Sequence, residues 1–309
     1  MAEKQPDGAP VADEQWLAER FDQHRSELRA VAYRMLGSLT EADDAIQEAW
    51  IRLSRSSADE IDNLGAWLTT VVGRVCLNML RTRSRRREDS MPIHMPDPIV
   101  VGDRHSDPEQ QALLADSVGL ALLVVLETLR PDERLAFVLH DMFAVPFDDI
   151  AAVIGCSPVA ARQHASRARR RVQGEAPPSD VDLAGQRKVV DAFFAAARDG
   201  DFDALVAVLD PDVVVRSDGG NLPAGAAAIL HGAAAVAAQA LAYARLAPFV
   251  RPAIVNGAAG VVVAPGGKPF SIMAFTIRGD RIVAIDALSD RARLAQLDLA
   301  VLDDQQNKG

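Results

Sequence analysis

The sequence predicts a multidomain protein with two all-α domains, the second a helix-turn-helix, followed by an α+β cone. Apolar residues recur at helical spacing through residues 13–174. Proline-rich stretches interrupt this pattern twice, and alternating apolar runs with glycine turns dominate the C-terminal part. The expected domains are a first helical domain at 13–89, a linker at 90–112, the helix-turn-helix domain at 113–174, a short linker at 175–182 and the cone at 183–309.

The composition is that of a globular protein with room for several cores. The chain has 309 residues, of which 49% are hydrophobic, and a formal net charge of −10. Its two cysteines, Cys76 and Cys156, lie far apart without metal-ligand spacing, so we expect no cofactor, metal site or disulfide framework. No apolar run is long enough to span a bilayer and no signal-like leader opens the chain, which predicts no membrane partner and a cytoplasmic location.

Three helices are expected in the first domain. The first covers about residues 13–36 and stops at Gly37, Thr40 opens the second, and Asn63 caps the third. One face of the second helix is acidic and polar, and the end of the third carries five arginines among residues 81–87. A solvated face is the usual fate of such charges, although one or two arginines would suffice to complement a helix dipole. The acidic face consists of Asp43, Asp44, Gln47 and Glu48.

Helices are expected at about residues 108–129 and 131–143, and residues 146–172 after them predict a helix-turn-helix. The first helix is expected at Phe147–Ile154, Gly155 suits its left-handed stop, and Ser157 and Pro158 suit the start of the second. A narrow face of the second helix allows close approach, whereas the opposite face can hydrogen-bond base edges and phosphates. A solvated basic helix in an ordinary bundle is the alternative. The narrow face is Ala161, Ala165, Ala168 and Val172, and the polar face is Arg162, Gln163, Ser166, Arg167 and Arg170.

Three segments, taken in order, resemble a bacterial sigma factor of the extracytoplasmic-function group over about residues 15–174: EADDAIQEAWIRL, GAWLTTVVGRVCLNMLRTRSRRR and LRPDERLAFVLHDMFAVPFDDIAAVIGCSPVAARQHASRARRRV. The resemblance implies a non-enzymatic transcription initiation factor whose partners are core RNA polymerase and promoter DNA. It also implies that the acidic face docks on the clamp helices of the largest polymerase subunit, through Asp43, Asp44, Gln47 and Glu48.

Two DNA contacts follow from the same resemblance. The loop at about 56–65 would hold a base flipped from the minus-ten element, and the third helix would track the strand backbone. The helix 157–172 would read the minus-thirty-five element. The implied minus-ten residues are Arg74, Asn78, Arg81, Arg85 and Arg86, and the implied minus-thirty-five residues are Ser157, Arg162, Gln163, Ser166 and Arg167.

Residues 183–309 predict helices followed by an antiparallel sheet, whose last strand, Arg281–Leu288, follows a Gly-Asp turn. The stretch FFAAARDGDFDALVAVLDPDVVVRSDGG resembles the SnoaL-like, NTF2-like fold, which forms a regulatory appendage in one sigma subgroup. In the linker, MPIHMPDPIV resembles a motif of that subgroup with its tryptophan replaced by His94 or Met95. SDGG and SDRARLAQL resemble two further motifs, which implies regulatory contacts at Asp218, Gly219, Gly220, Asp290 and Leu294.

Catalysis by the cone is the remaining question. Enzymes of this fold place acids and bases inside the cone, but no acid–base pair is fixed by the spacing, so we favour a regulatory module and leave a small-molecule ligand open. A ligand-responsive helix-turn-helix regulator, or a cyclase or isomerase fused to a DNA-binding arm, stays an alternative that would not need the acidic helix and the arginine run. The catalytic candidates are Asp218, His231, Arg216, Arg251 and Asp286.

Overall fold

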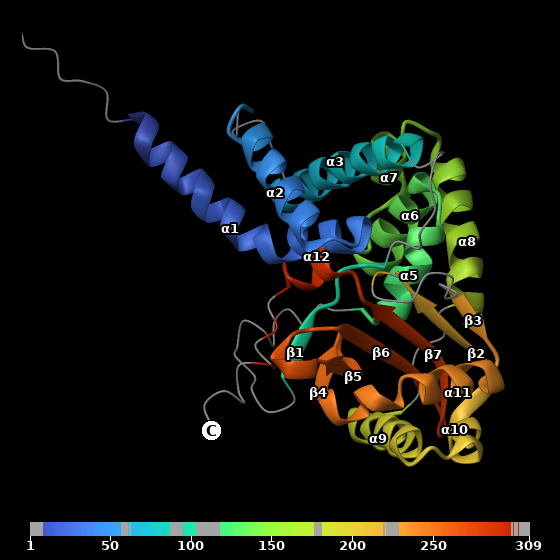
Figure 1. Ribbon diagram of the computed structural model, residues 1–309. Coiled ribbons are helices and arrows are strands. Elements are labelled where there is room, and N and C mark those ends of the chain that lie inside the picture. The colour runs from blue at the N-terminus through green and yellow to red at the C-terminus, as the bar shows by residue number, and fades with distance from the viewer. Residues whose placement is uncertain are drawn as a thin grey trace, which may run out of the picture. The chain divides into compact units, whose positions relative to one another are not determined.

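The computed structural model describes residues 9–56, 61, 63–86, 95–102, 118–175, 181–218, 220, 229–297, 299 and 302. The chain divides into two compact units, which are treated separately below. The helical unit comprises Met1–Asp89 and Leu129–Arg170, and the cone unit comprises Ser90–Thr128 and Arg171–Gly309. Figure 1 shows the helices of the first in blue to green and most strands of the second in orange to red.

The helical unit begins with α1 (Ala9–Leu36), α2 (Leu39–Leu53) and α3 (Leu64–Arg86). Gly37, at φ 68°, ends α1 as expected. The start of α2 differs from the prediction: its N-cap is Ser38 rather than Thr40, and the Ser38 hydroxyl accepts a hydrogen bond from the Glu41 amide at 3.4 Å. Asn63 caps α3 as predicted, since its side chain accepts a bond from the Ala66 amide at 3.1 Å.

The apolar spacing predicts that the third helix packs through Leu64, Trp67, Leu68, Val71, Val75 and Leu80, but the buried face of α3 is rotated from this stripe. Trp67 and Val71 are only half-buried, whereas Val72, Cys76 and Leu77 are buried. The reason is that α3 packs on two sides, against α1 and α2 and against α6 and α7. A single amphipathic stripe cannot describe a helix that is covered on two sides.

The rest of the helical unit contains α6 (Pro131–Phe137), the π-helix η3 (Val138–Met142), α7 (Phe147–Ile154) and most of α8 (Pro158–Glu175). The single helix expected at 131–143 is therefore an α-helix that widens into a π-turn before α7. The bounds of α7 agree with the prediction, and α8 starts at Pro158 as expected. The helix expected at 108–129 is described only as α5 (Leu120–Thr128), which belongs to the cone unit.

The cone unit is a sheet with α9 and α11 packed on one face (Figure 1). Its helices are α5, given above, α9 (Leu183–Asp199), α10 (Phe202–Val208), α11 (Ala233–Ala242), the 3-10 helix η4 (Ala244–Phe249) and the short η5 (Pro265–Gly267) and α12 (Arg291–Leu294). The strands are β1 (Val100–Gly102), β2 (Leu209–Ser217), β3 (Ile229–His231), β4 (Val250–Val255), β5 (Ala258–Val263), β6 (Ser271–Arg278) and β7 (Arg281–Leu288). Their order across the sheet is β1-β4-β5-β6-β7-β2-β3.

Three features of the sheet depart from the prediction. The sheet is mixed rather than antiparallel, because β2 pairs parallel to β7. Strand β3 lies in the glycine- and alanine-rich section, where no strand is expected. Strand β1 lies within the stretch 90–112 and pairs with β4, so the expectation of a linker without strand or helix is wrong at Val100–Gly102. The prolines of this stretch make a strand unfavourable on local grounds. The edge of the sheet at β4, however, offers unpaired backbone groups with which Val100–Gly102 can pair.

Alternation along the strands divides the side chains between two faces of the sheet. Apolar residues such as Phe275, Ile277 and Ile285 pack with Val190 and Phe193 in the core beneath α9 and α11. The α+β cone that the sequence predicts is thus confirmed. The same alternation places Arg216 and Asp286 on the other face, which decides their roles below.

Candidate functional site

The helix-turn-helix is built from a tight turn and an alanine seam. Gly155 adopts φ 82° at the end of α7, and the Ser157 hydroxyl accepts a hydrogen bond from the Ala160 amide at 3.2 Å. The seam of α8 is buried at Ala161, Ala165 and Ala168, while Val172 is half-buried. The buried alanine seam therefore faces the interior of the unit, and the turn residues fix where α8 begins.

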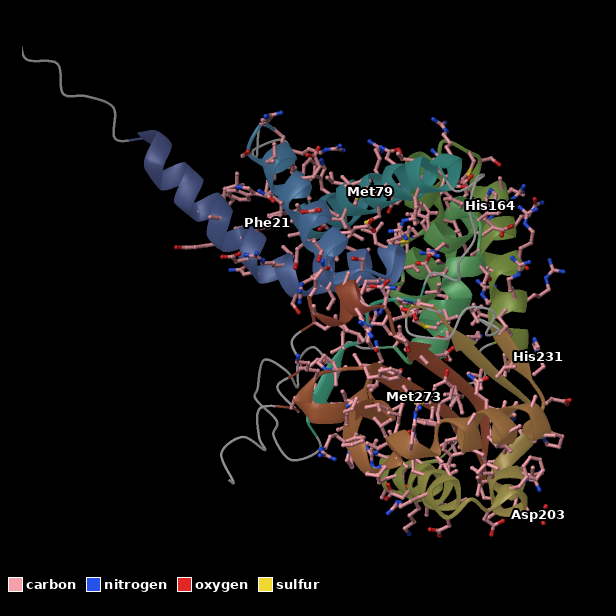
Figure 2. The ribbon with its side chains drawn as sticks, viewed as in Figure 1. Phe21, Met79, His164, Asp203, His231 and Met273 are labelled. Atoms are coloured by element: carbon pink, nitrogen blue, oxygen red, sulfur yellow. The ribbon has the colours of Figure 1, made fainter. Side chains whose placement is uncertain are left out.

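The outer face of α8 carries the polar residues that the sequence selects. Arg162 and Gln163 are exposed, and the Arg162 guanidinium lies 5.5 Å from the centre of the Phe147 ring. Within the described part of the chain, the Gln163 side chain has no hydrogen-bond partner. Further along, Arg167 forms an ion pair with Glu133 at 3.2 Å and Ser166 is half-buried. Figure 2 labels His164 on the same helix.

The arginine-bearing side of α3 faces the helix-turn-helix. Arg81 Nη2 donates to Asp132 Oδ1 at 2.8 Å and to the Ile154 carbonyl at 3.5 Å. Arg74 Nη2 donates to the Ala152 carbonyl at 3.4 Å. Two of the residues expected to contact the minus-ten strand are thus held by α6 and α7, the elements of the helix-turn-helix domain.

The remaining minus-ten candidates differ in what surrounds them. Asn78 and Arg85 are exposed, and neither side chain has a partner among the described residues. Arg86 closes α3, but its side chain lies outside the described part, as do residues 57–60 and 62 of the expected base pocket. Sequence reasoning missed the role of Arg83, which donates to the Leu36 carbonyl at 3.2 Å and pairs with Glu41. That arginine of the run therefore ties α3 to the junction of α1 and α2.

A close approach lets α3 meet the second helical domain. A Cβ atom on Gly73 would lie 3.2 Å from Leu139 Cδ1 and 3.5 Å from Leu135 Cδ1. Buried Arg134 extends from α6 and donates to the Met35 carbonyl at 2.8 Å. The two helical domains are therefore packed together in this conformation through apolar and polar contacts.

The acidic face of α2 lies beside a groove that α1 and α2 form. The groove has a volume of about 350 Å³, and its walls include Phe21, labelled in Figure 2, and Trp50. The centres of these two rings lie 5.2 Å apart, in an edge-to-face arrangement. Asp43 pairs with Arg29 at 2.7 Å, and Glu48 pairs with Arg52 at 2.9 Å. Exposed Asp44 and Gln47 also line the groove, and within the described residues their side chains lack partners.

In the cone unit, Asp218 organises two of the stretches that the sequence singles out. Its carboxylate accepts hydrogen bonds from the Ser289 and Asp290 amides, both at 2.9 Å, and from the Gly220 amide at 3.2 Å. A Cβ atom on Gly220 would lie 2.4 Å from Asp290 Cα, so only glycine fits there. The SDGG loop and the start of SDRARLAQL are therefore in direct contact; Gly219 lies outside the described residues.

The segment after Asp290 also reaches the linker. Asp290 caps α12 through the Arg293 amide at 2.9 Å, Leu294 is buried, and the Arg293 side chain pairs with Asp97. The partner of Arg293 lies in the third motif-like stretch, MPIHMPDPIV. All three stretches singled out in the sequence are thus joined by hydrogen bonds; His94 lies outside the described residues, and Met95 is buried.

Asn256 holds the linker at a second point, which sequence reasoning missed. The side-chain Oδ1 of Asn256 accepts a hydrogen bond from the Ile99 backbone amide at 3.0 Å, and the Asn256 backbone amide donates to the Ile99 carbonyl at 2.9 Å. The side-chain Nδ2 donates to the Val118 carbonyl at 3.3 Å. Asn256 is buried at φ 49° and precedes Gly257 in the two-residue turn between β4 and β5. The Asn-Gly pair is a strong hairpin signal, but nothing in the sequence indicates that the turn also holds the linker.

A cavity of about 140 Å³ lies inside the cone, between the sheet and α9, α11 and η4. None of the five catalytic candidates lines it. Arg216 and Asp286 form a two-pronged ion pair at 2.7 and 3.1 Å on the opposite face of the sheet. Burial raises the pKa of Asp286, and the charge of Arg216 opposes that rise. This pair joins β2 to β7 and does not line the cavity.

The other catalytic candidates are also placed away from the cavity. Asp218 forms the loop contacts described above, and exposed His231 lies on β3, as Figure 2 shows. The position of His231 just before Gly232 and the next helix also suggests a helix cap, but the N-cap of α11 is Gly232, without a side-chain cap, so that interpretation is wrong. Arg251 donates only to nearby carbonyls of Pro248 and Val250. The described cavity lining therefore contains no carboxylate or imidazole that could act as acid or base.

Two further features concern membranes and cysteines. Among the described helices, none is long and apolar enough to cross a bilayer. Cys76 and Cys156 are both free, and burial raises the pKa of the Cys76 thiol well above its ordinary value. Cys76 is therefore an inert packing residue of α3.

Comparison with known proteins matches both helical domains to families. Residues 20–86 match Sigma-70 region 2 and residues 119–172 match Sigma-70 region 4. The chain is 39% identical over 279 residues to the ECF RNA polymerase sigma factor SigJ of Mycobacterium tuberculosis (strain ATCC 25618 / H37Rv), covering 86% of this chain and 89% of SigJ. It is 40% identical over 198 residues to the probable ECF RNA polymerase sigma factor SigI of Mycobacterium tuberculosis (strain CDC 1551 / Oshkosh), covering 63% of this chain and 67% of that protein.

The likeness extends to three dimensions and includes the cone. The crystal structure of Mycobacterium tuberculosis SigJ superposes with a TM-score of 0.73 at 35% sequence identity, over 90% of this chain and 98% of that chain. A match of this length covers both helical domains and the C-terminal unit. The chain belongs to the extracytoplasmic-function sigma factors of RNA polymerase.

Proposed function

We propose that this sigma factor reads two promoter elements with its helical unit, and that its cone unit controls initiation by holding the linker between regions 2 and 4. The observation that carries the proposal is the capture of the linker by the cone: β1 extends the sheet, Asn256 binds Ile99 and Val118, and Arg293 pairs with Asp97. Because both polymerase and chromosomal DNA are intracellular in bacteria, the cytoplasm is the expected place of action.

Reading of the minus-thirty-five element is assigned to α8. Recognition helices contact base edges mainly with residues near their N-terminus. Arg162 and Gln163 lie within the first two turns of α8 and are exposed, which supports base contacts. Ser157 lies at the N-terminus, where phosphate contacts are favourable. Ser166 and Arg167 lie one turn further on, and we assign them to the DNA backbone.

Contact with the minus-ten strand is assigned to α3, through Arg74, Asn78, Arg81, Arg85 and Arg86. In the present conformation Arg74 and Arg81 are occupied by the Ala152 carbonyl and Asp132. The two promoter elements lie about 25 base pairs apart, roughly 85 Å at ~3.4 Å per base pair. Helices in direct contact cannot engage both elements, so we infer that the packing of α3 on α6 and α7 opens before promoter binding.

Polymerase docking is assigned to α2. Asp44 and Gln47 are exposed and free of side-chain partners within the described chain, which supports them as the principal contacts. Asp43 and Glu48 are already paired with Arg29 and Arg52 on the same surface. Their exposed ion pairs are worth at most about 1 kcal/mol each, so they can rearrange when a basic partner surface arrives.

The reach of the chain explains how capture of the linker can inhibit. Asp97, residues 99–102 and Val118 are attached to the cone, so the chain between α3 and the attached segment is residues 87–94. Eight residues span at most about 28 Å, far less than the separation of the two promoter elements. A held linker therefore restricts the distance between regions 2 and 4, and its release should promote initiation.

Run-off transcription with purified core polymerase and the full-length chain tests the function directly. Reversing the charge on the acidic face with the double substitution Asp44→Lys and Glu48→Lys should abolish association with core polymerase, because Asp44 is exposed and half-buried Glu48 makes only a partly exposed ion pair with Arg52. Circular dichroism checks the fold, and co-purification measures the association. Normal co-purification of the folded variant would contradict the docking assignment.

A substitution at the cone tests the control of the linker. Asn256→Gly keeps the left-handed turn but removes both side-chain hydrogen bonds to the linker, which should weaken its attachment by about 1–3 kcal/mol. Hydrogen exchange at Ile99 should accelerate and run-off transcription should rise. Asn256→Asp is the matched control, because it retains an acceptor for the Ile99 amide. Its exchange rate at Ile99 and its transcription should lie between those of the parent protein and the Asn256→Gly variant. Faster exchange without any change in transcription would contradict the regulatory role.

A further inference from the structure

The cavity of the cone has the size and walls of a small-molecule site. Its volume of about 140 Å³ is close to that of an apolar protein cavity of about 150 Å³ that binds benzene. Aromatic surface comes from Phe193, Phe194 and Phe270. The ring centres of Phe193 and Phe194 lie 5.2 Å apart, in an edge-to-face arrangement. Met273, labelled in Figure 2, and Ile285 form part of the sheet side. The space therefore matches about one ring with apolar surroundings.

Two polar side chains at the wall are available to a ligand. Gln239 and Tyr243 lie four residues apart at the end of α11 and so share one side of the helix. Both are half-buried, and neither side chain has a hydrogen-bond partner within the described part of the chain. By contrast, the nearby hydroxyls of Ser271 and Ser289 are bonded to each other at 3.0 Å. An incoming polar group would therefore be met by the Gln239 amide and the Tyr243 phenol.

The electrostatics of the lining select against charge. The lining residues are all neutral, and the Arg216–Asp286 pair lies on the other face of the sheet. A carboxylate or an ammonium group taken into this space would lose hydration without gaining a counter-charge, which is strongly unfavourable. A neutral molecule with one hydrogen-bonding group loses little, because Gln239 can donate or accept and Tyr243 can do the same.

We propose that the cone binds a small, neutral, one-ring molecule that carries a single hydroxyl or carbonyl group. The ring lies among Phe193, Phe194 and Phe270, and the polar group bonds to Gln239 and Tyr243. This proposal concerns binding and stands apart from the control of the linker. It has a place in that control if the proposed function holds, because Ser289 lines the cavity and its amide is bound by Asp218 beside the segment that carries Arg293.

Titration calorimetry with p-cresol tests the site on the full-length chain. We expect one molecule to bind per chain with a dissociation constant below about 1 mM, given its few non-hydrogen atoms, whereas p-hydroxybenzoate, its charged counterpart, should bind at least about tenfold more weakly. Ala240→Phe places a ring in the cavity and should abolish binding. Ala242→Phe is the matched control, because Ala242 is exposed on the same helix and does not line the cavity. This variant should bind p-cresol like the parent protein.

Tyr243→Phe keeps the ring and removes only the hydroxyl. It should weaken binding of p-cresol about two- to tenfold and leave binding of toluene unchanged, which keeps the test decisive even if Ala240→Phe does not fold. Absence of saturable p-cresol binding to the parent protein, or equal binding to the Ala240→Phe and Ala242→Phe variants, overturns the proposal. Binding that leaves hydrogen exchange at Ile99 unchanged upholds the site and separates it from the control of the linker.

Discussion

The two arginine-bearing helices of the helical unit differ in what their side chains contact. At the start of α8, Arg162 and Gln163 are exposed, with only the Phe147 ring beneath the arginine. On α3, Arg74 and Arg81 contact backbone and carboxylate groups of α6 and α7. Under the proposed function, α8 is available to DNA as it stands, whereas α3 must first leave its contacts with α6 and α7. Similar basic sequences can therefore correspond to an open surface or to an internal contact.

The difference also indicates where regulation can act. An exposed recognition helix offers little to regulate, but a helix that must detach can be controlled through the elements that restrict its movement. The cone unit holds the linker that follows α3, and it does so with backbone pairing and with the buried Asn256. Three substitutions test this contrast, in order of decreasing effect.

The largest effect is expected from Gly73→Leu, which breaks the packing of α3. The additional side chain would enter the space of Leu139 and Leu135, and such overpacking typically costs about 1–3 kcal/mol. The closed arrangement should therefore be disfavoured, and the unpaired minus-ten strand should bind more tightly. Fluorescence anisotropy with a labelled single-stranded minus-ten oligonucleotide measures this change.

Gly73→Ala is the matched control for that variant. Its methyl group would lie 3.2 Å from a terminal methyl of Leu139, a contact that a small movement relieves. Both substitutions raise helix propensity by roughly 1 kcal/mol relative to glycine, so weaker folding of α3 cannot explain a difference between them. Equal affinity of the parent and both variants would show that the packing does not limit access to α3.

The second prediction concerns the open helix, through Arg162→Ala. Loss of a base contact should weaken promoter binding by ~1–3 kcal/mol and relax the preference at one or two upstream positions. The helical unit should keep its thermal stability, because Arg162 is exposed and its guanidinium lies over the Phe147 ring of the same motif. Competition with promoter and random duplexes measures the specificity, and an equal loss on both would identify Arg162 as a phosphate contact instead.

The smallest effect is expected from Asp132→Ala, which releases Arg81. The pair is more than a third exposed on each side, at 39% and 35%, so its contribution is at most about 1 kcal/mol after screening by solvent. Binding of the minus-ten strand should improve by a factor of a few at low salt. Asp141→Ala is the control, since it removes the ion pair with Arg169 on α8 and does not touch α3; an identical gain in that variant would rule out release of Arg81 as the cause.

Much of this protein follows from local patterns in the sequence. The left-handed stop at Gly155, the cap at Ser157 and the alanine seam of α8 depend on residues within one or two turns of each other, so their chemistry is readable without the fold. The family is identified by sigma-like segments that can each be recognised in the sequence and that occur in a characteristic order. The last strand, Arg281–Leu288, is also predicted at its observed bounds because alternation and a glycine turn are local signals.

Only the tertiary structure decided which surfaces meet. Asn256 and Ile99 are 157 residues apart, and no local pattern links a hairpin turn to a distant linker strand. The direction of β2 beside β7, the face on which Asp286 lies and the occupation of Arg81 by Asp132 likewise depend on contacts across long sequence separations. Local preferences specify each element, but the pairing of elements is set by the burial of surfaces that come together only when the chain has folded.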